Sequence, residues 1–169
     1  KEVQRYNLMI KSKTSVKKVI FFDGDGTLWY PRKTKHTEKP HWVYKDKSIK
    51  DYHPHLVLIP TVEKTLKKLN KVGIITILLS THPHEIKEAY RVMNKKVDYF
   101  KLKKLFTEIH ATREYHKSKG AYIVEILKRL KIPKSKALMV GDNYLWDYKP
   151  ARNIGVEALL IQSDYMKKD

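Results

Sequence analysis

The chain has 169 residues, enough for one domain with a hydrophobic core, and we expect a single domain over residues 1–169. It contains no cysteine, which excludes a disulfide scaffold, a thiolate metal site and a cysteine nucleophile. No apolar run approaches the roughly 20 residues needed to span a bilayer, and no signal peptide is visible, so we expect a cytoplasmic protein with no membrane partner. Lys and Arg number 36 against 18 Asp and Glu, a formal net charge of +18. Such a surface is either simply soluble or attracts polyanions such as nucleic acid.

Apolar segments predict strands and helices in alternation along the chain. We expect strands at about residues 17–22, 74–79, 104–109, 136–140 and 156–161, and helices at about 61–71, 83–95, 118–131 and 144–153. Alternation of this kind is typical of βαβ units, so we predict an α/β fold in which helices cover both faces of a parallel sheet, a three-layer α/β/α Rossmann-like arrangement. Active sites of such sheets lie at the carboxyl ends of the strands.

The first predicted strand ends at two aspartates, Asp23 and Asp25, that are separated by one glycine. The preceding residues 19–22 are β-branched or aromatic, and Gly24 and Gly26 let the backbone turn tightly and present carboxylates and amides to a ligand. One carboxylate can attack phosphorus, while the other protonates the leaving oxygen and then deprotonates water. Two adjacent carboxylates repel, so a divalent cation is expected between them. The alternative is an acidic turn with no catalytic role.

Residues 23–28, Asp-Gly-Asp-Gly-Thr-Leu, resemble motif I of the haloacid dehalogenase superfamily, whose members are mostly magnesium-dependent phosphatases. The resemblance implies that Asp23 is the nucleophile and that Asp25 is the general acid and base and lends its backbone carbonyl to the metal. Mg²⁺ is then the expected cofactor. The loop residues expected to contact phosphate or substrate are Gly24, Gly26, Thr27 and Trp29.

A hydroxyl group is expected after the second strand, to hydrogen-bond a phosphoryl oxygen. Ser80 and Thr81 follow the apolar residues 74–79, and we favour Ser80 because it comes directly after the apolar run. Thr81 stays a candidate for phosphate binding. His82 lies two residues after Ser80, so we also expect it near the substrate.

A lysine is expected to neutralise charge on the nucleophile and the phosphate. Lys117 and Lys119 precede a helix whose apolar residues Ile123, Ile126 and Leu130 recur at helical spacing. A lysine at the start of this helix can point at the strand ends. We rank Lys119 above Lys117, because its spacing to these apolar residues looks like the Ser-Lys pattern of one branch of the superfamily.

A second acidic cluster follows the strand predicted at residues 136–140. Gly141-Asp142-Asn143, with Asp147 five residues after Asp142, resembles the fourth motif of the superfamily. The resemblance implies that Asp142 binds the metal in an oxygen-rich site suited to Mg²⁺. Asp147 and Asn143 are expected to lie behind the metal ligands, where Asp147 holds a metal-bound water or Lys119. The alternative for Asp142 is a helix N-cap.

The overall pattern looks like the eukaryotic-type magnesium-dependent phosphatase family, a small branch without a cap domain that acts on phosphotyrosine-like or sugar-phosphate substrates. The features that carry this resemblance are Trp29, Pro60 at a helix start, Tyr99-Phe100 and Ser118-Lys119. The chain departs from the branch at two places. Gly24 replaces a larger apolar residue, and Asn143 follows Asp142 where the branch has paired aspartates.

Residues 29–59 interrupt the alternation and are expected to form a flap rather than a cap domain. Residues 42–44 and 56–59 are predicted to pair as a β-hairpin that covers the active site. His53 and His55 in this flap are either local, solvated side chains, which we favour, or ligands of a transition metal. Aromatic residues lie between its basic residues, so bases of a nucleic acid can stack there. These are Trp29, Tyr30, Trp42 and Tyr44.

Together these features predict a metal-dependent phosphomonoester hydrolase that acts on a phosphorylated small molecule or a phosphotyrosine-like substrate. Two alternatives stay open because of the charge. One is a polynucleotide-end phosphatase with the same catalytic residues, and the other is a catalytically silent, basic nucleic-acid-binding module. Nothing in the sequence indicates the oligomeric state.

Overall fold

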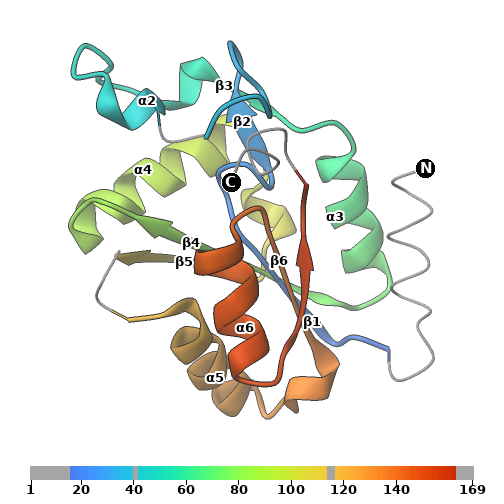
Figure 1. Cartoon of the computed structure of the whole chain (residues 1–169). Helices are drawn as coiled ribbons and strands as arrows, with labels where there is room; N and C mark the ends of the chain where they lie inside the picture. Colours follow the sequence, from blue (N-terminus) through green and yellow to red (C-terminus); the bar gives the residue numbers. More distant parts are fainter. Residues whose placement is uncertain (1–15, 40–41, 114–116, 163–169) are drawn as a thin grey trace.

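The computed structural model describes residues 16–39, 42–113 and 117–162. Its central sheet has five strands, which are β1 (Val19–Phe22), β4 (Ile75–His82), β5 (Glu108–Arg113), β6 (Ala137–Gly141) and β7 (Glu157–Leu160). The strands are parallel throughout and lie in the order β5-β4-β1-β6-β7 (Figure 1). The predicted parallel sheet is therefore confirmed, with β1 at its centre.

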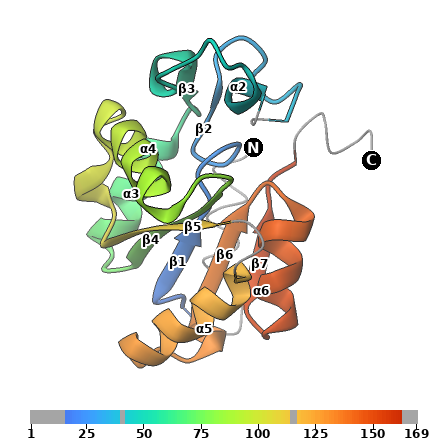
Figure 2. The same ribbon diagram turned by 90° about the vertical axis from the view of Figure 1, so that its left-hand side faces the viewer.

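Helices cover both faces of the sheet. α3 (Val62–Lys71) and α4 (Ile86–Tyr99) pack on one face, and α5 (Lys119–Leu130) and α6 (Lys149–Asn153) pack on the other (Figure 2). This is the predicted three-layer α/β/α arrangement. Short helical turns complete the backbone, at η1 (His53–His55), η2 (Lys103–Leu105), η3 (Lys134–Lys136) and the π-helical turn η4 (Tyr144–Tyr148). Among the residues described, no helix is both long and apolar enough to cross a membrane.

β1 is apolar at every position because both of its faces are covered. Ile20 and Phe22 belong to the core under α3 and α4, whereas Val19 and Phe21 belong to the core under α5 and α6. All four side chains are buried, as expected for a central strand of a parallel sheet. The chain leaves β1 with the Asp23 N–H donating to the carbonyl of Val140 at the end of β6 (2.9 Å). Neighbouring strands thus fix where Asp23 emerges.

Several of the predicted elements have different boundaries in the structure. β4 continues to His82, three residues beyond the predicted end, because residues 80–82 pair with residues 111–113 of β5. The strand predicted at 104–109 accordingly lies at 108–113, and the helix predicted at 83–95 lies at 86–99. The helix predicted at 144–153 is divided into η4 and α6.

The predicted hairpin between residues 42–44 and 56–59 is wrong. β3 (Leu56–Leu58) pairs antiparallel with β2 (Trp29–Pro31), directly after the aspartates, and residues 42–45 form the short helix α2 (Trp42–Lys45). This pairing buries Trp29 and Leu56 completely in the core under α3 and α4, which the predicted pairing does not do. The hairpin and α2 stand beyond the carboxyl end of β1 (Figure 2).

Candidate active site

The loop after β1 is a tight turn around two glycines. The carbonyl of Gly24 accepts the N–H groups of Thr27 (3.1 Å) and Leu28 (2.8 Å). Gly26 has φ +80°, in the left-handed region that favours glycine. A Cβ at Gly26 would also overlap the Asp142 carboxylate. The turn therefore needs glycine at position 26 for its backbone conformation and for the close approach of Asp142.

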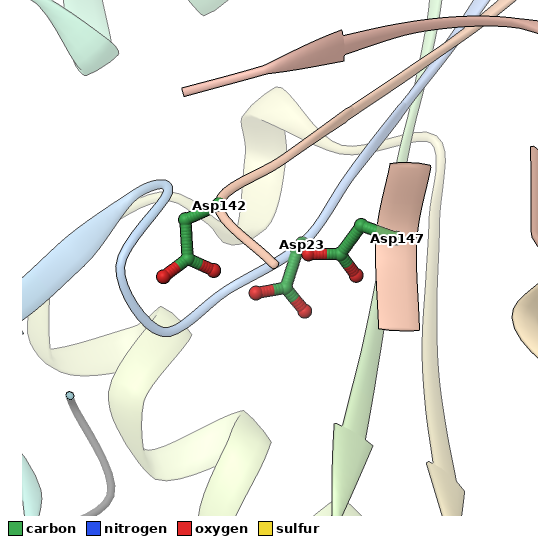
Figure 3. A group of neighbouring side chains, drawn as sticks. All are labelled: Asp23, Asp142 and Asp147. Carbon is green, nitrogen blue, oxygen red and sulfur yellow. The ribbon is translucent and has the colours of Figure 1, made fainter. Parts of the chain in front are cut away.

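Three buried carboxylates meet at the carboxyl end of the sheet. Asp23 follows β1, Asp142 follows β6, and Asp147 comes from the turn η4. Oxygen atoms of the three lie within 4.8 Å of one another. Figure 3 shows Asp23 between Asp142 and Asp147. The structure thus brings Asp23 together with Asp142 and Asp147, which lie more than 100 positions later in the sequence.

Lys119 is the lysine that reaches this cluster. Its Nζ lies 2.6 Å from Asp23 Oδ1 and 2.5 Å from Asp147 Oδ1, and the side chain is buried. Lys119 is the first residue of α5, and the Ser118 hydroxyl caps this helix by accepting the Ala121 N–H (3.2 Å). Lys117 instead pairs with Glu125 on the outside of the helix. The position of the cap thus directs one of the two candidate lysines inward.

Burial dominates the electrostatics of the cluster. It raises the pKa of Asp23 to about 7, an effect that Lys119 opposes and Asp147 reinforces. Burial and the charges of Asp23 and Asp147 also raise the pKa of Asp142 well above its usual range. For Lys119, burial would lower the pKa, but the two carboxylates that it contacts outweigh burial and raise it.

The donor set fits a hard divalent cation. Three buried carboxylates lie close together in a desolvated site, where Lys119 pairs with Asp23 and Asp147. All the ligand atoms that the cluster offers are oxygens, the type that Mg²⁺ prefers. His53 and His55 of the flap belong to no group of three or more potential metal ligands among the described residues. A transition-metal site of that size is therefore not formed by the described part of the flap.

Both oxygens of Asp147 already have hydrogen-bond donors. Oδ1 accepts from Lys119, and Oδ2 accepts the backbone N–H of Asn143 (3.0 Å). The Asn143 side-chain oxygen in turn accepts the N–H groups of Leu145 (3.0 Å) and Trp146 (3.1 Å), and so caps the turn η4. Asp147 therefore ties the start of α5 to the loop after β6.

Asp25 faces a lysine that the sequence analysis did not single out. Lys96 Nζ lies 3.0 Å from both carboxylate oxygens of Asp25, and the side chain of Lys96 is completely buried. Lys96 comes from α4, seven residues after Ala89, on the same buried side of the helix as Met93. In the sequence, Lys96 is marked only by its helical spacing from the apolar residues of α4. Among so many lysines, that spacing does not distinguish it.

Trp29 has a different environment from the one expected. It is completely buried, its ring stacks on Phe100 (centroids 5.7 Å apart), and its Nε1–H donates to Asp25 Oδ1 (2.7 Å). Trp29 is thus not exposed for stacking on a base in this structure, and its contact with substrate stays a prediction. A Cβ at Gly24 would lie only 2.8 Å from Trp29 Cζ2. The indole ring explains why glycine stands at position 24.

The polar residues at the end of β4 point in different directions. Ser80 is buried beside the loop, and a Cβ at Gly24 would lie 3.1 Å from its Oγ. Thr81 instead contacts Thr112 of β5 through their hydroxyl groups (3.0 Å). The geometry therefore places Ser80, and not Thr81, next to the loop that carries the aspartates.

Two buried polar side chains near the loop have no hydrogen-bond partner in the described part of the chain. They are His82, at both ring nitrogens, and Thr27, at its hydroxyl. His82 is 1% exposed, and burial lowers its pKa to about 4, so the ring is neutral near pH 7. Buried polar groups in proteins are nearly always paired, so these two side chains are open to hydrogen bonds from a ligand.

The sequence model of one family, the haloacid dehalogenase-like hydrolases, matches residues 2–161. The chain belongs to this family. The resemblance expected from the four motifs is thus confirmed over nearly the whole sequence, and the class of protein is a haloacid dehalogenase-type hydrolase.

Individual relatives are distant. The chain is 26% identical over 122 residues to a protein of Caldanaerobacter subterraneus subsp. tengcongensis named "Putative pyrophosphatase PpaX". That match covers 71% of this chain and 52% of the relative, so the chain spans about half the length of this curated relative.

Similar solved structures confirm the fold. An uncharacterized protein from Listeria monocytogenes serotype 4b has a TM-score of 0.63 at 22% identity, with 86% of this chain and 78% of that chain covered. A haloacid dehalogenase-like hydrolase from Streptococcus pneumoniae has a TM-score of 0.61 at 17% identity, covering 86% and 85%. A HAD phosphatase from Thermococcus onnurineus has a TM-score of 0.60 at 16% identity, covering 86% of each chain.

Proposed function

We propose that this chain is a magnesium-dependent phosphomonoester hydrolase that works through an aspartyl-phosphate on Asp23. The observation that carries the proposal is the position of Lys119 Nζ, between Asp23 and Asp147 in a buried carboxylate cluster. A nucleophilic carboxylate needs a neighbouring cation, because its substrate is itself an anion. Membership of a hydrolase family supports the same reaction class.

Mg²⁺ would be held by the carboxylates of Asp23 and Asp142 and by the backbone carbonyl of Asp25. The bound cation would neutralise phosphoryl oxygens and reduce the repulsion among the carboxylates of the cluster. Asp147 already accepts hydrogen bonds at both oxygens, which supports a role in holding Lys119 and the loop at Asn143.

The reaction proceeds in two steps on the residues of this chain. Asp23 attacks phosphorus, and the bond to the leaving oxygen breaks as Asp25 donates a proton to that oxygen. Ser80 and Lys119 hold the phosphoryl oxygens in both steps. Asp25 then takes a proton from the water that attacks the phosphoryl group, which frees Asp23 and releases inorganic phosphate.

The substrate is a phosphomonoester whose leaving group lies beside Thr27 and His82. Their free hydroxyl and ring nitrogens support hydrogen bonds to bound substrate. Phosphotyrosine-like and sugar-phosphate substrates are the ones that the resemblance to the branch without a cap domain implies. The net charge of +18 favours, as a second candidate, a phosphate at the end of a nucleic acid.

Phosphate release from a panel of substrates tests this function. The panel contains 4-nitrophenyl phosphate, phosphotyrosine, sugar phosphates, pyrophosphate and oligonucleotides with a 3′- or 5′-phosphate, each with Mg²⁺ and with chelator. Pyrophosphate is included because one relative is named as a pyrophosphatase. We expect turnover that requires Mg²⁺ and that disappears in Asp23→Asn, since the amide is no nucleophile. Turnover that persists in Asp23→Asn would refute the proposal, and turnover of pyrophosphate alone would refute the phosphomonoester assignment.

A further inference from the structure

Asp25, Lys96 and Trp29 form one buried unit beside the proposed catalytic cluster. Lys96 Nζ lies 3.0 Å from each oxygen of Asp25, and Trp29 Nε1 lies 2.7 Å from Asp25 Oδ1. The ammonium group also faces the indole ring of Trp29, 5.7 Å from its centroid. The three residues come from the loop after β1, from α4 and from β2, so the unit joins three separate segments.

This arrangement fixes the carboxyl group of Asp25 from two directions. A carboxylate that has one partner can still rotate about its own axis, whereas one that has donors on both oxygens cannot do so without losing a hydrogen bond. Trp29 is itself held in place, because its ring is stacked on Phe100. Asp25 is thus held by groups that are rigid and almost without contact to solvent.

The position of Lys96 is an unfavourable one for packing alone. It occupies a site on the buried side of α4, next to Met93 and Val97, where an apolar residue would complete the core without desolvating an ammonium group. Its exposed neighbour Lys95 pairs instead with Asp51 of the flap (2.6 Å). The helix therefore presents one lysine to the surface and one to Asp25.

We propose that Lys96, assisted by Trp29, is a positioning residue that holds Asp25 in the orientation for proton transfer to the leaving oxygen. The inference rests on the proposed function, which gives Asp25 this proton transfer. Lys96 itself touches no substrate and transfers no proton. Its effect is confined to the part of the reaction in which Asp25 acts.

Substrates that differ only in their leaving group distinguish this role from a structural one. Release of 4-nitrophenolate needs little protonation, whereas release of unsubstituted phenolate needs an acid in place. For Lys96→Met we expect kcat/KM on phenyl phosphate to fall by about tenfold to a hundredfold, within the range of general-acid contributions, while kcat/KM on 4-nitrophenyl phosphate changes by less than about threefold. The parameter kcat/KM is used because it reports the transfer of the phosphoryl group to Asp23.

Two further variants complete the experiment. Lys95→Met removes a lysine from the neighbouring, exposed position of α4, and we expect it to leave both substrates unaffected. Trp29→Phe retains an aromatic ring for stacking on Phe100 but lacks the N–H donor, so it should show the same selective loss as Lys96→Met to a smaller degree. Trp29→Phe leaves Lys96 in place and tests the unit even where Lys96→Met is too unstable to purify.

The ammonium group at position 96 can also be restored chemically, because the chain has no other cysteine that would be alkylated. Lys96→Cys, alkylated with 2-bromoethylamine in the unfolded state and then refolded, carries an ammonium group at the length of a lysine side chain. We expect this derivative to recover phenyl phosphate turnover, whereas the same protein alkylated with bromoethane should not. Wild-type enzyme carried through the same unfolding and refolding is the reference.

The outcomes separate this inference from the proposed function. Equal losses on both esters, or no loss on either, in Lys96→Met and Trp29→Phe would overturn the positioning role while leaving the phosphatase activity in place. No turnover of either ester by the wild-type enzyme would overturn the proposed function and this inference together.

Discussion

Asp23, Asp142 and Asp147 lie together in a buried site where Lys119 pairs with Asp23 and Asp147, and we expect this crowding of carboxylates to determine how the site responds to pH and metal. Burial raises the pKa of Asp23 and of Asp142, so protons and a divalent cation compete for the same oxygens. The single positive charge of Lys119 is shared between Asp23 and Asp147, so it does not by itself keep both carboxylates ionised.

Mg²⁺ binding should therefore strengthen as the pH rises through about 7, the value to which burial raises the pKa of Asp23. Below that pH the cation has to displace a proton, so its affinity falls by up to about tenfold per pH unit for each proton displaced. Above that pH the carboxylate of Asp23 is already ionised and the dependence on this group disappears. Isothermal titration calorimetry with Mg²⁺ at a series of pH values measures this. An affinity that does not change with pH would contradict the competition.

The two candidate lysines should differ sharply when each is replaced by alanine. Lys119→Ala removes the ammonium group that pairs with Asp23 and Asp147, so we expect kcat/KM to fall by roughly 10²-fold or more, with a loss of stability of about 3–5 kcal/mol. Lys117→Ala breaks only the pair with Glu125 and should change stability by less than about 1 kcal/mol and leave turnover intact. Steady-state kinetics and denaturant unfolding provide both numbers. A larger kinetic effect at Lys117 would reverse the assignment.

The turn after β1 can pack closely against the loop after β6 because Gly26 has no side chain to collide with Asp142. Gly26 and Gly73 have nearly the same positive φ, +80° and +77°. They differ in surroundings, since a Cβ at Gly26 would overlap Asp142, whereas a Cβ at Gly73 would meet nothing within 4 Å. Substituting alanine at each position therefore separates two effects, because both variants strain the backbone but only the one at Gly26 displaces Asp142.

Gly26→Ala should weaken Mg²⁺ binding, and Gly73→Ala should not. Both variants carry the backbone cost of a non-glycine residue in the left-handed region, about 1 kcal/mol or more of stability. Only Gly26→Ala also forces Asp142 away from Asp23, and we expect its Mg²⁺ affinity to fall by about tenfold or more, as for displaced metal-site partners. Titration calorimetry and thermal unfolding of both variants test the comparison. Equal Mg²⁺ affinities would show that Asp142 is not required for the cation.

Elements with a strong apolar pattern could be predicted from the sequence, and elements formed by long-range pairing could not. β1 and α5 lie within two residues of their predicted bounds because their apolar residues follow the period of a strand or a helix. The polar residues 80–82 look like a loop, yet they extend β4 because β5 pairs with them. The partner of β3 was missed for a similar reason. Only the folded structure shows that Trp29, paired with β3, is buried in the core under α3 and α4.

The residues of the candidate site also divide into those that could be predicted from the sequence and those that could not. The spacing of the acidic motifs gave Asp23, Asp142 and Asp147 as a group, because parallel strands carry their carboxyl ends to one edge of the sheet. Lys96 could not be found in this way, because it lies in the middle of a helix and belongs to no motif. Its significance depends on a contact between residues 71 positions apart.

The net charge of +18 should affect the binding of a nucleic-acid substrate and of a small-molecule substrate differently. A polyanionic substrate releases counterions when it binds a basic surface, so its binding weakens steeply with salt. A small ester interacts with few charges outside the active site.

If the basic surface guides the substrate, kcat/KM on a phosphorylated oligonucleotide should fall at least about tenfold between about 50 and 200 mM salt, while 4-nitrophenyl phosphate stays within about twofold. The two substrates are compared with the same enzyme preparation and the same Mg²⁺ concentration. An equal salt dependence for both would mean that the surface charge serves solubility alone.

Covalent phosphorylation of Asp23 is tested most directly by acid quenching. Enzyme mixed with Mg²⁺ and excess 4-nitrophenyl phosphate is quenched in acid, digested and analysed by mass spectrometry. The proposed mechanism predicts one added phosphoryl group on the peptide that contains Asp23, labile to hydroxylamine as an acyl phosphate and absent from Asp23→Asn. Turnover by the wild-type enzyme with phosphorylation of another residue, or with no phosphorylated peptide after rapid quenching in the first turnovers, would contradict it.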